Sequence, residues 1–106
     1  MLLREYIDPS GRSPFGRWFD ALPAVAAMHV TQALAKLETG LTGNMKSVGA
    51  GVHELKVDHG PGYRVYFARD GNALIVLLGG GAKKRQNEDI RAATERWRRY
   101  KKTSRK

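Results

Sequence analysis

The chain has 106 residues, enough for one small domain and too few for two independent cores. Hydrophobic residues make up 42% and charged residues 27%, which is ordinary for a globular protein and unlike a disordered one. There is no cysteine, which excludes disulfide scaffolds, thiolate zinc sites and cysteine nucleophiles. The three histidines lack metal-ligand spacing, and no apolar run is long enough to span a bilayer. We therefore expect a soluble, cytoplasmic protein without a metal or other cofactor and without a membrane partner.

The net charge of +9 is concentrated at the C-terminal end of the chain. From Lys83 onward, eleven basic and three acidic residues give a net charge of +8, whereas the first 82 residues carry a net charge of +1. This asymmetry favours a polyanionic partner, either nucleic acid or an acidic protein, over a solvated tail that only aids solubility. We expect a single domain over residues 1–102 followed by a basic tail at 103–106.

The first half of the chain predicts a strand followed by two helices. Apolar residues at 2–7 indicate a short strand. Ser13 is a typical N-cap followed by a proline, and apolar residues then recur at helical spacing over 14–22. Pro23 closes this helix and opens a second one, whose apolar positions continue at helical spacing to Leu41. The two helices are expected to form a hairpin with one apolar side.

The second half predicts three strands after a glycine-containing loop at 44–51, which includes Lys46. Alternating apolar and polar residues indicate strands at 52–57 and 63–67, joined by the turn at 59–62. The run 73–78 is apolar on both faces, which is typical of a central strand.

Glycines at 79–81 are expected to break the central strand, and a last helix begins near Arg85. The glycines and the lysines after them lack the spacing of a nucleotide-binding phosphate loop. Trp18 and Trp97 lie on apolar helix faces, so we expect both in the core. His53 is expected to be packed or at a rim rather than catalytic. The order β-α-α-β-β-β-α predicts an α+β domain.

Four polar side chains share one face of the two alternating strands: Glu54, Lys56, Arg64 and Tyr66. An open sheet face that carries lysine, arginine and tyrosine is suited to binding a phosphate. An ordinary solvated face, with ion pairs from Glu54 to Lys56 or Arg64, is an equal alternative. Either interpretation places Arg64 away from the core, so Arg64→Ala is expected to cost little stability.

Several segments together resemble one known family. They are GNMKSVG at 43–49, GVHELK at 51–56, GPGYRVYF at 60–67, LLGGG at 77–81 and KKRQNEDI at 83–90. In order and spacing they resemble the RelE/ParE superfamily of toxin–antitoxin toxins, and most closely the HigB-like branch of addiction module killer proteins. The resemblance extends from residue 15 to about residue 93.

This resemblance implies a RelE-like fold: a small twisted antiparallel sheet, packed against an N-terminal helical hairpin, with a C-terminal helix. It implies a metal-independent endoribonuclease, an mRNA interferase that cuts mRNA in the ribosomal A site and so inhibits translation. The implied partners are the ribosome, mRNA and a cognate antitoxin with a helix-turn-helix domain.

The resemblance also implies roles for individual residues. Arg64 matches the strand arginine that contacts the scissile phosphate, Lys56 matches one of two lysines on the preceding strand, and Lys83 matches a basic residue before the last helix. Tyr66 is a candidate for the acid–base role. Seven further basic residues are expected to bind RNA and the ribosome: Lys46, Lys84, Arg85, Arg91, Arg98, Lys101 and Lys102.

Two positions depart from the family pattern. Glu54 stands where RelE has its other lysine, and no tyrosine lies near Ile90, where RelE has a catalytic one. Two alternatives therefore stay open. The first is a ParE-like inhibitor of DNA gyrase, and the second is a catalytically degenerate module that only binds nucleic acid.

Overall fold

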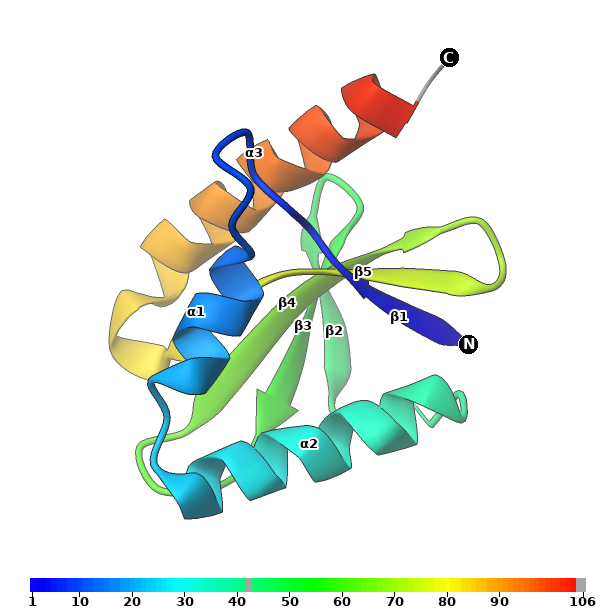
Figure 1. Ribbon diagram of the computed structural model, residues 1–106. Coiled ribbons are helices and arrows are strands. Elements are labelled where there is room, and N and C mark those ends of the chain that lie inside the picture. The colour runs from blue at the N-terminus through cyan, green and yellow to red at the C-terminus, as the bar shows by residue number, and fades with distance from the viewer. Residues whose placement is uncertain (42, 105–106) are drawn as a thin grey trace.

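The computed structural model describes residues 1–41 and 43–104 and shows a five-stranded sheet with helices packed on both of its faces (Figure 1). The expected α+β class is confirmed. The elements in chain order are β1 (Leu2–Glu5), α1 (Pro14–Asp20), α2 (Ala24–Glu38), β2 (Met45–Gly49), β3 (Val52–Val57), β4 (Tyr63–Asp70), β5 (Leu74–Ala82), the 3-10 turn η1 (Lys83–Arg85) and α3 (Gln86–Ser104).

The strand order across the sheet is β1-β5-β4-β3-β2. Strands β2 to β5 form consecutive antiparallel pairs, in agreement with the predicted sheet. The first strand differs, because β1 pairs with β5 in parallel, with Leu2 opposite Leu74. A parallel pair needs a long connection, and residues 6–73 separate these two strands in sequence.

One face of the sheet is covered by α1 and α2. The side chain of Ser13 accepts a hydrogen bond from the Gly16 N–H at 2.9 Å, so the predicted N-cap is confirmed. Helix α1 packs mainly on β5, and α2 packs on β3. Val30 and Leu37 of α2 are buried in this core as expected, but Leu41 lies beyond the end of the helix and is 62% exposed.

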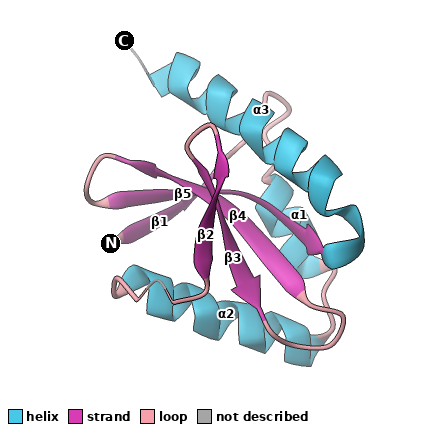
Figure 2. Ribbon diagram, turned by 180° about the vertical axis from the view of Figure 1, so that it is seen from behind, coloured by secondary structure: helices cyan, strands magenta, loops and turns pink. Residues whose placement is uncertain are grey.

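Helix α3 covers the opposite face of the sheet, as Figure 2 shows from behind. Its residues Ala93 and Trp97 pack on Val52, Ala68 and Val76 of the central strands. The predicted core position of Trp97 is confirmed, and Trp18 packs against the other core. The expectation of an open, solvated sheet face is wrong, because α3 lies across it.

The loop expected at 44–51 is in fact mostly a strand. Residues 45–49 form β2, which pairs antiparallel with β3 and places Met45 opposite Leu55. The connection is tight, since Ala50 and Gly51 both adopt positive φ angles, 56° and 83°. The sequence signal was weak because this strand contains lysine, serine and a terminal glycine, and its register is irregular near Ser47.

The glycines at 79–81 do not break β5, which continues to Ala82. They instead leave space for side chains on both faces of the strand. A Cβ atom on Gly80 would collide with the Trp18 ring, and one on Gly81 would collide with the Asp89 carboxylate. The missing side chains therefore let α1 and α3 approach the same strand closely.

Helix α3 continues to Ser104, two residues beyond the expected end of the domain at residue 102. Residues 105 and 106 of that tail lie outside the described residues. None of the helices in the described part of the chain is long and apolar enough to cross a membrane.

We predict that Gly80→Ala destabilises the domain by about 1–3 kcal/mol, the usual range for overpacking a core. The Trp18 ring cannot yield easily, because it packs against Phe15 and Tyr63. Urea denaturation measures the decrease in the free energy of unfolding. The matched control is Gly43→Ala, since a Cβ atom there meets nothing within 4 Å. Equal stability of the two variants would contradict the close packing.

Candidate functional site

The centre of the polar cluster is the Glu54 carboxylate, which is 2% exposed. The Nε of Arg64 lies 3.2 Å from Oε1 of Glu54, and the Nζ of Lys46 lies 3.7 Å from Oε2. The side-chain amide of Gln86 donates a hydrogen bond of 2.7 Å to Oε1. One carboxylate thus joins β2, β4 and the first residue of α3.

Arg64 and Tyr66 lie under α3 rather than at the surface. Arg64 is 7% exposed and Tyr66 is fully buried. The Nε and Nη1 of Arg64 and the hydroxyl of Tyr66 have no hydrogen-bond partner among the described residues. Arg64 and Glu54 therefore form a buried ion pair without hydrogen-bond geometry. The expectation that Arg64→Ala costs little stability assumed an arginine away from the core, and the burial of Arg64 contradicts that premise.

Burial also sets the protonation of the groups around this ion pair. It raises the pKa of the Tyr66 hydroxyl well above its usual value, and the nearby charges of Glu54 and Asp89 raise it further. Tyr66 is therefore neutral near pH 7 and holds its proton more tightly than an exposed tyrosine. Burial raises the pKa of Asp89 and lowers that of Arg96.

Asp89 and Arg96 make contacts with β5 that the sequence did not predict. The Nη1 of Arg96 donates a hydrogen bond of 3.0 Å to the carbonyl of Leu78. A Cβ atom on Gly79 would lie 2.6 Å from that same Nη1, and Gly81 leaves the space for Asp89. The glycine run was the available signal, because glycines within a strand mark the close approach of another group.

The predicted catalytic cations meet at one end of three adjacent strands. Lys56 pairs with Arg64 across β3 and β4, and Arg64 lies opposite Gly81 of β5. Lys83 follows two residues later, and its backbone N–H donates to the carbonyl of Gly62 at 3.3 Å. The exposed members are Lys56 and Lys83, whereas Arg64 lies beneath α3.

A polar hollow of about 340 Å³ surrounds the start of α3. Its lining includes four of the predicted basic residues, Lys83, Lys84, Arg85 and Arg91. The amides Gln86 and Asn87 and the acid Glu88 complete it. Arg85 is engaged by Glu88 at 2.7 Å, and the lysines form no ion pair with any described residue. This concentration of exposed cations can bind a phosphate backbone.

The other predicted RNA-binding residues lie apart from this hollow. Lys101 is about 22 Å along the helix axis from the start of α3, at 1.5 Å per residue. Its ammonium lies 5.5 Å from the centre of the Trp97 ring, and Arg98 pairs with Glu95 at 2.6 Å. Lys102 is exposed on the same end of α3. The basic residues that follow one another in the C-terminal quarter of the sequence therefore form two separate regions in the structure, one at each end of α3.

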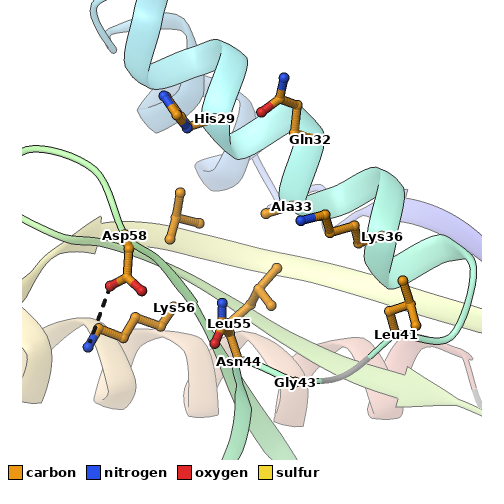
Figure 3. Close-up of a pocket in the computed structure, with 11 residues that line it drawn as sticks. His29, Gln32, Ala33, Lys36, Leu41, Gly43, Asn44, Leu55, Lys56 and Asp58 are labelled. Carbon is orange, nitrogen blue, oxygen red and sulfur yellow. Dashed lines mark ion pairs between the residues drawn. The ribbon is translucent and has the colours of Figure 1, made fainter.

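A second hollow, which sequence reasoning did not find, lies between α2 and β3 and has a volume of about 500 Å³ (Figure 3). It is lined from α2, from Leu41, Gly43 and Asn44, and from the end of β3. No pattern in the sequence links these three segments, because they come together only in the folded domain. Lys56 is the predicted site residue that also lines this groove.

No cluster of three or more side chains able to hold a metal ion occurs within residues 1–41 and 43–104.

Comparisons with known proteins found one matching family and one curated relative. The family model described as "Phage derived protein Gp49-like (DUF891)" matches residues 17–100. An uncharacterised protein of Haemophilus influenzae is 38% identical over 80 residues, which is 74% of this chain and 81% of the relative. The family match includes α2, all of β2 to β5 and most of α3.

We predict that Arg64→Ala lowers the free energy of unfolding by about 3 kcal/mol or more, because it leaves the buried Glu54 carboxylate without its arginine. The double variant Glu54→Gln/Arg64→Met should regain most of this loss, since it removes both charges. Chemical denaturation of the single and double variants measures their free energies of unfolding and shows how much of the loss is regained. Lys56→Ala is the matched control and should change stability by no more than about 0.5 kcal/mol, as its partner Asp58 is also exposed.

Proposed function

This chain belongs to the phage-derived Gp49-like family, an addiction-module toxin family of the RelE type, and we propose that it acts as the toxin of a type II toxin–antitoxin system. We infer further that it is a ribosome-dependent endoribonuclease of the cytoplasm, with a RelE-like arrangement of α1, α2 and the sheet. One observation carries this proposal beyond the family match. Lys56, Arg64 and Lys83 lie at the same end of three adjacent strands, and the two exposed lysines among them are available to a phosphate group.

In the proposed reaction the RNA supplies its own nucleophile. The ribose 2′-hydroxyl gives up its proton to water as its oxygen forms a bond to phosphorus, the bond from phosphorus to the 5′-oxygen breaks, and the leaving 5′-oxygen takes up a proton. Negative charge develops on the phosphoryl oxygens during this attack. Fixed cations stabilise that charge, so exposed Lys56 and Lys83 contact the phosphate directly in this proposal.

Arg64 and Tyr66 act from beneath these lysines. Arg64 adds positive charge below the phosphate, although Glu54 offsets part of it. Tyr66 has the neutral hydroxyl that a proton donor requires, but α3 covers it. A catalytic role for Tyr66 therefore requires the first turn of α3 to move away from β4.

The remaining cations divide between two RNA-binding regions in this proposal. Around the start of α3 these are Lys46, Lys84, Arg85 and Arg91, which hold the mRNA backbone beside the scissile phosphate. At the far end of α3, Arg98, Lys101 and Lys102 contact ribosomal RNA. The antitoxin is encoded beside the toxin and carries a helix-turn-helix domain, as in the HigB-like branch.

The burial of Arg64 and Tyr66 favours the alternative functions. A gyrase inhibitor or a catalytically degenerate RNA-binding module needs no accessible arginine or tyrosine on the sheet. In either case the Glu54–Arg64 pair would serve the fold alone, while the basic surface of α3 would bind the partner.

Expression without the antitoxin should arrest growth through loss of translation. Primer extension on a cellular mRNA should reveal new 5′ ends within codons soon after induction. Supercoiling of a plasmid, measured in the same cells, distinguishes the alternatives. Relaxed or broken DNA with intact mRNA would indicate a gyrase inhibitor instead of a nuclease. Normal growth at high expression would contradict both toxic activities.

Lys56→Ala and Lys83→Ala should each lower cleavage on programmed ribosomes by roughly 10- to 100-fold, less than the loss of a buried oxyanion donor. Both side chains are exposed, so the melting temperature should stay unchanged. Arg17→Ala removes an exposed cation from α1 and serves as the control. Full activity of both lysine variants would contradict the proposed contact of Lys56 and Lys83 with the scissile phosphate.

Binding to single-stranded RNA should weaken steeply as the salt concentration rises, because neutralised phosphates release counterions. Replacing Lys101 and Lys102 by glutamine should reduce the slope of log K against log salt by about 1.4 if each lysine contacts one phosphate. Titrations at several salt concentrations measure this slope. An unchanged slope would exclude phosphate contacts at this end of α3.

A further inference from the structure

A pocket of about 440 Å³ lies between the segment that follows β1 and the last turns of α3. Figure 1 shows the blue loop after β1 beside this helix. We call it the loop–helix pocket, and its volume is in the range of pockets that bind small organic groups. It is lined mainly by Tyr6, Ile7, Asp8 and Pro9 of the loop and by Arg99 and Lys102 of α3.

The loop supplies an apolar surface. Tyr6 is 6% exposed and belongs to the core beneath α3, so it closes the pocket on the inner side. Ile7 is 55% exposed, and Pro9 is exposed as well. An unstacked nucleobase has a flat face that can cover such a surface, and its burial there removes apolar area from water.

Helix α3 supplies two cations to the pocket. Arg99 and Lys102 are three residues apart, so their side chains are neighbours on the helix surface. Lys102 forms no ion pair with any residue in the described part of the chain. The Nε of Arg99 lies 3.4 Å from Glu95, a carboxylate that also binds Arg98 more closely, at 2.6 Å. Both cations can therefore contact a phosphate group.

Asp8 supplies a hydrogen-bond acceptor. Its Oδ1 accepts from the backbone N–H groups of Ser10 and Arg12 at 2.9 and 3.0 Å, and from the Ser10 hydroxyl at 2.6 Å. Its Oδ2 accepts no hydrogen bond from the residues that the structure describes. The hydrogen bond from the Ser10 hydroxyl, followed by that from Arg12, lowers the pKa of Asp8, so the group is a carboxylate near pH 7. Such an oxygen can accept from the amino group of a base.

We propose that the loop–helix pocket binds one unstacked nucleotide of ribosomal RNA whose base carries an exocyclic amino group. The base lies against Ile7 and Pro9, its amino group donates to Oδ2 of Asp8, and its phosphate contacts Arg99 and Lys102. This inference rests on the proposed function, which brings this end of α3 against ribosomal RNA. An acidic peptide fits less well, because Asp8 would repel the carboxylates that the two cations attract.

The pocket lies far from the proposed cleavage site. Arg99 is 13 residues after Gln86, the first residue of α3, which is about 20 Å at 1.5 Å per residue. A nucleotide bound in the pocket therefore positions the toxin on the ribosome and takes no part in breaking the RNA chain. Loss of this contact should raise KM on programmed ribosomes and leave kcat unchanged.

The first experiment compares two RNA probes by fluorescence anisotropy with the full chain. Oligocytidine and oligouridine are both pyrimidine chains, but cytosine carries an amino group where uracil carries a carbonyl oxygen. The wild type should bind oligocytidine at least fivefold more tightly. Asp8→Asn keeps the Oδ1 acceptor and places an N–H donor where Oδ2 was, so it should bind oligouridine at least as tightly as oligocytidine. Equal affinity of the wild type for both probes would overturn the proposal.

Matched variants test the other two contacts. Arg99→Gln and Ile7→Ala should each weaken oligocytidine binding at least threefold and keep the melting temperature of the wild type, because both side chains are exposed. The controls are Arg17→Gln and Leu2→Ala, an exposed cation and an exposed apolar residue that do not line the pocket. Losses as large in the controls would indicate an effect of overall charge or hydrophobicity and contradict a site at this pocket.

The ligand could also be a free nucleotide, which has the same chemistry. Free cytidine monophosphate should bind at least tenfold more weakly than oligocytidine, because it cannot also contact the neighbouring cations of α3. Equal or tighter binding of the free nucleotide would overturn the assignment to RNA.

Failure of the pocket and failure of the proposed function give different results. If the chain arrests growth and cleaves mRNA, but Asp8→Asn leaves the preference between the two probes unchanged, the pocket inference is wrong and the proposed function stands. If the preference depends on Asp8 but expression leaves growth and mRNA intact, the toxin function is wrong and the pocket is a site of an RNA-binding module. If neither effect is seen, both are wrong.

Discussion

Glu54 carries a carboxylate that is 2% exposed, and the arrangement of the sheet and of α3 depends on how that charge is paired. A buried charge without a partner costs several kcal/mol, so the fold must supply cations and hydrogen-bond donors to this one group. Arg64 comes from β4, Lys46 comes from β2 and Gln86 comes from α3. The carboxylate thereby fixes the position of two strands and one helix relative to β3.

The same pairing limits how Arg64 can take part in chemistry. A guanidinium held 3.2 Å from a buried carboxylate is partly neutralised, and α3 keeps it from solvent. In the proposed function, a phosphate meets the two exposed lysines, Lys56 and Lys83, before the buried charge of Arg64. Glu54, at the position where the RelE resemblance implies a lysine, therefore supports the fold by pairing with Arg64 and Gln86.

The local features of this chain were predictable, and the long-range ones were not. The N-cap at Ser13 and the strand at 52–57 were each predicted from residues that are close together in the sequence. Both predictions were confirmed. The cover over Glu54, Arg64 and Tyr66 depends on where α3 docks, which no local pattern specifies. The polar residues therefore indicated a solvated face, when in fact Glu54 pairs with Arg64 and Gln86 beneath α3.

The glycines of β5 show how one residue type supports opposite interpretations. Glycine has a low strand propensity, so a run of three predicts the end of a strand. In the folded domain two packed layers converge on this segment, since Trp18 approaches from one side and Asp89 and Arg96 approach from the other. Side chains at 79–81 would hold those layers apart. The strand continues because packing on both faces outweighs the weak intrinsic preference, and this close approach brings the start of α3, with its cations, next to Lys56 and Arg64.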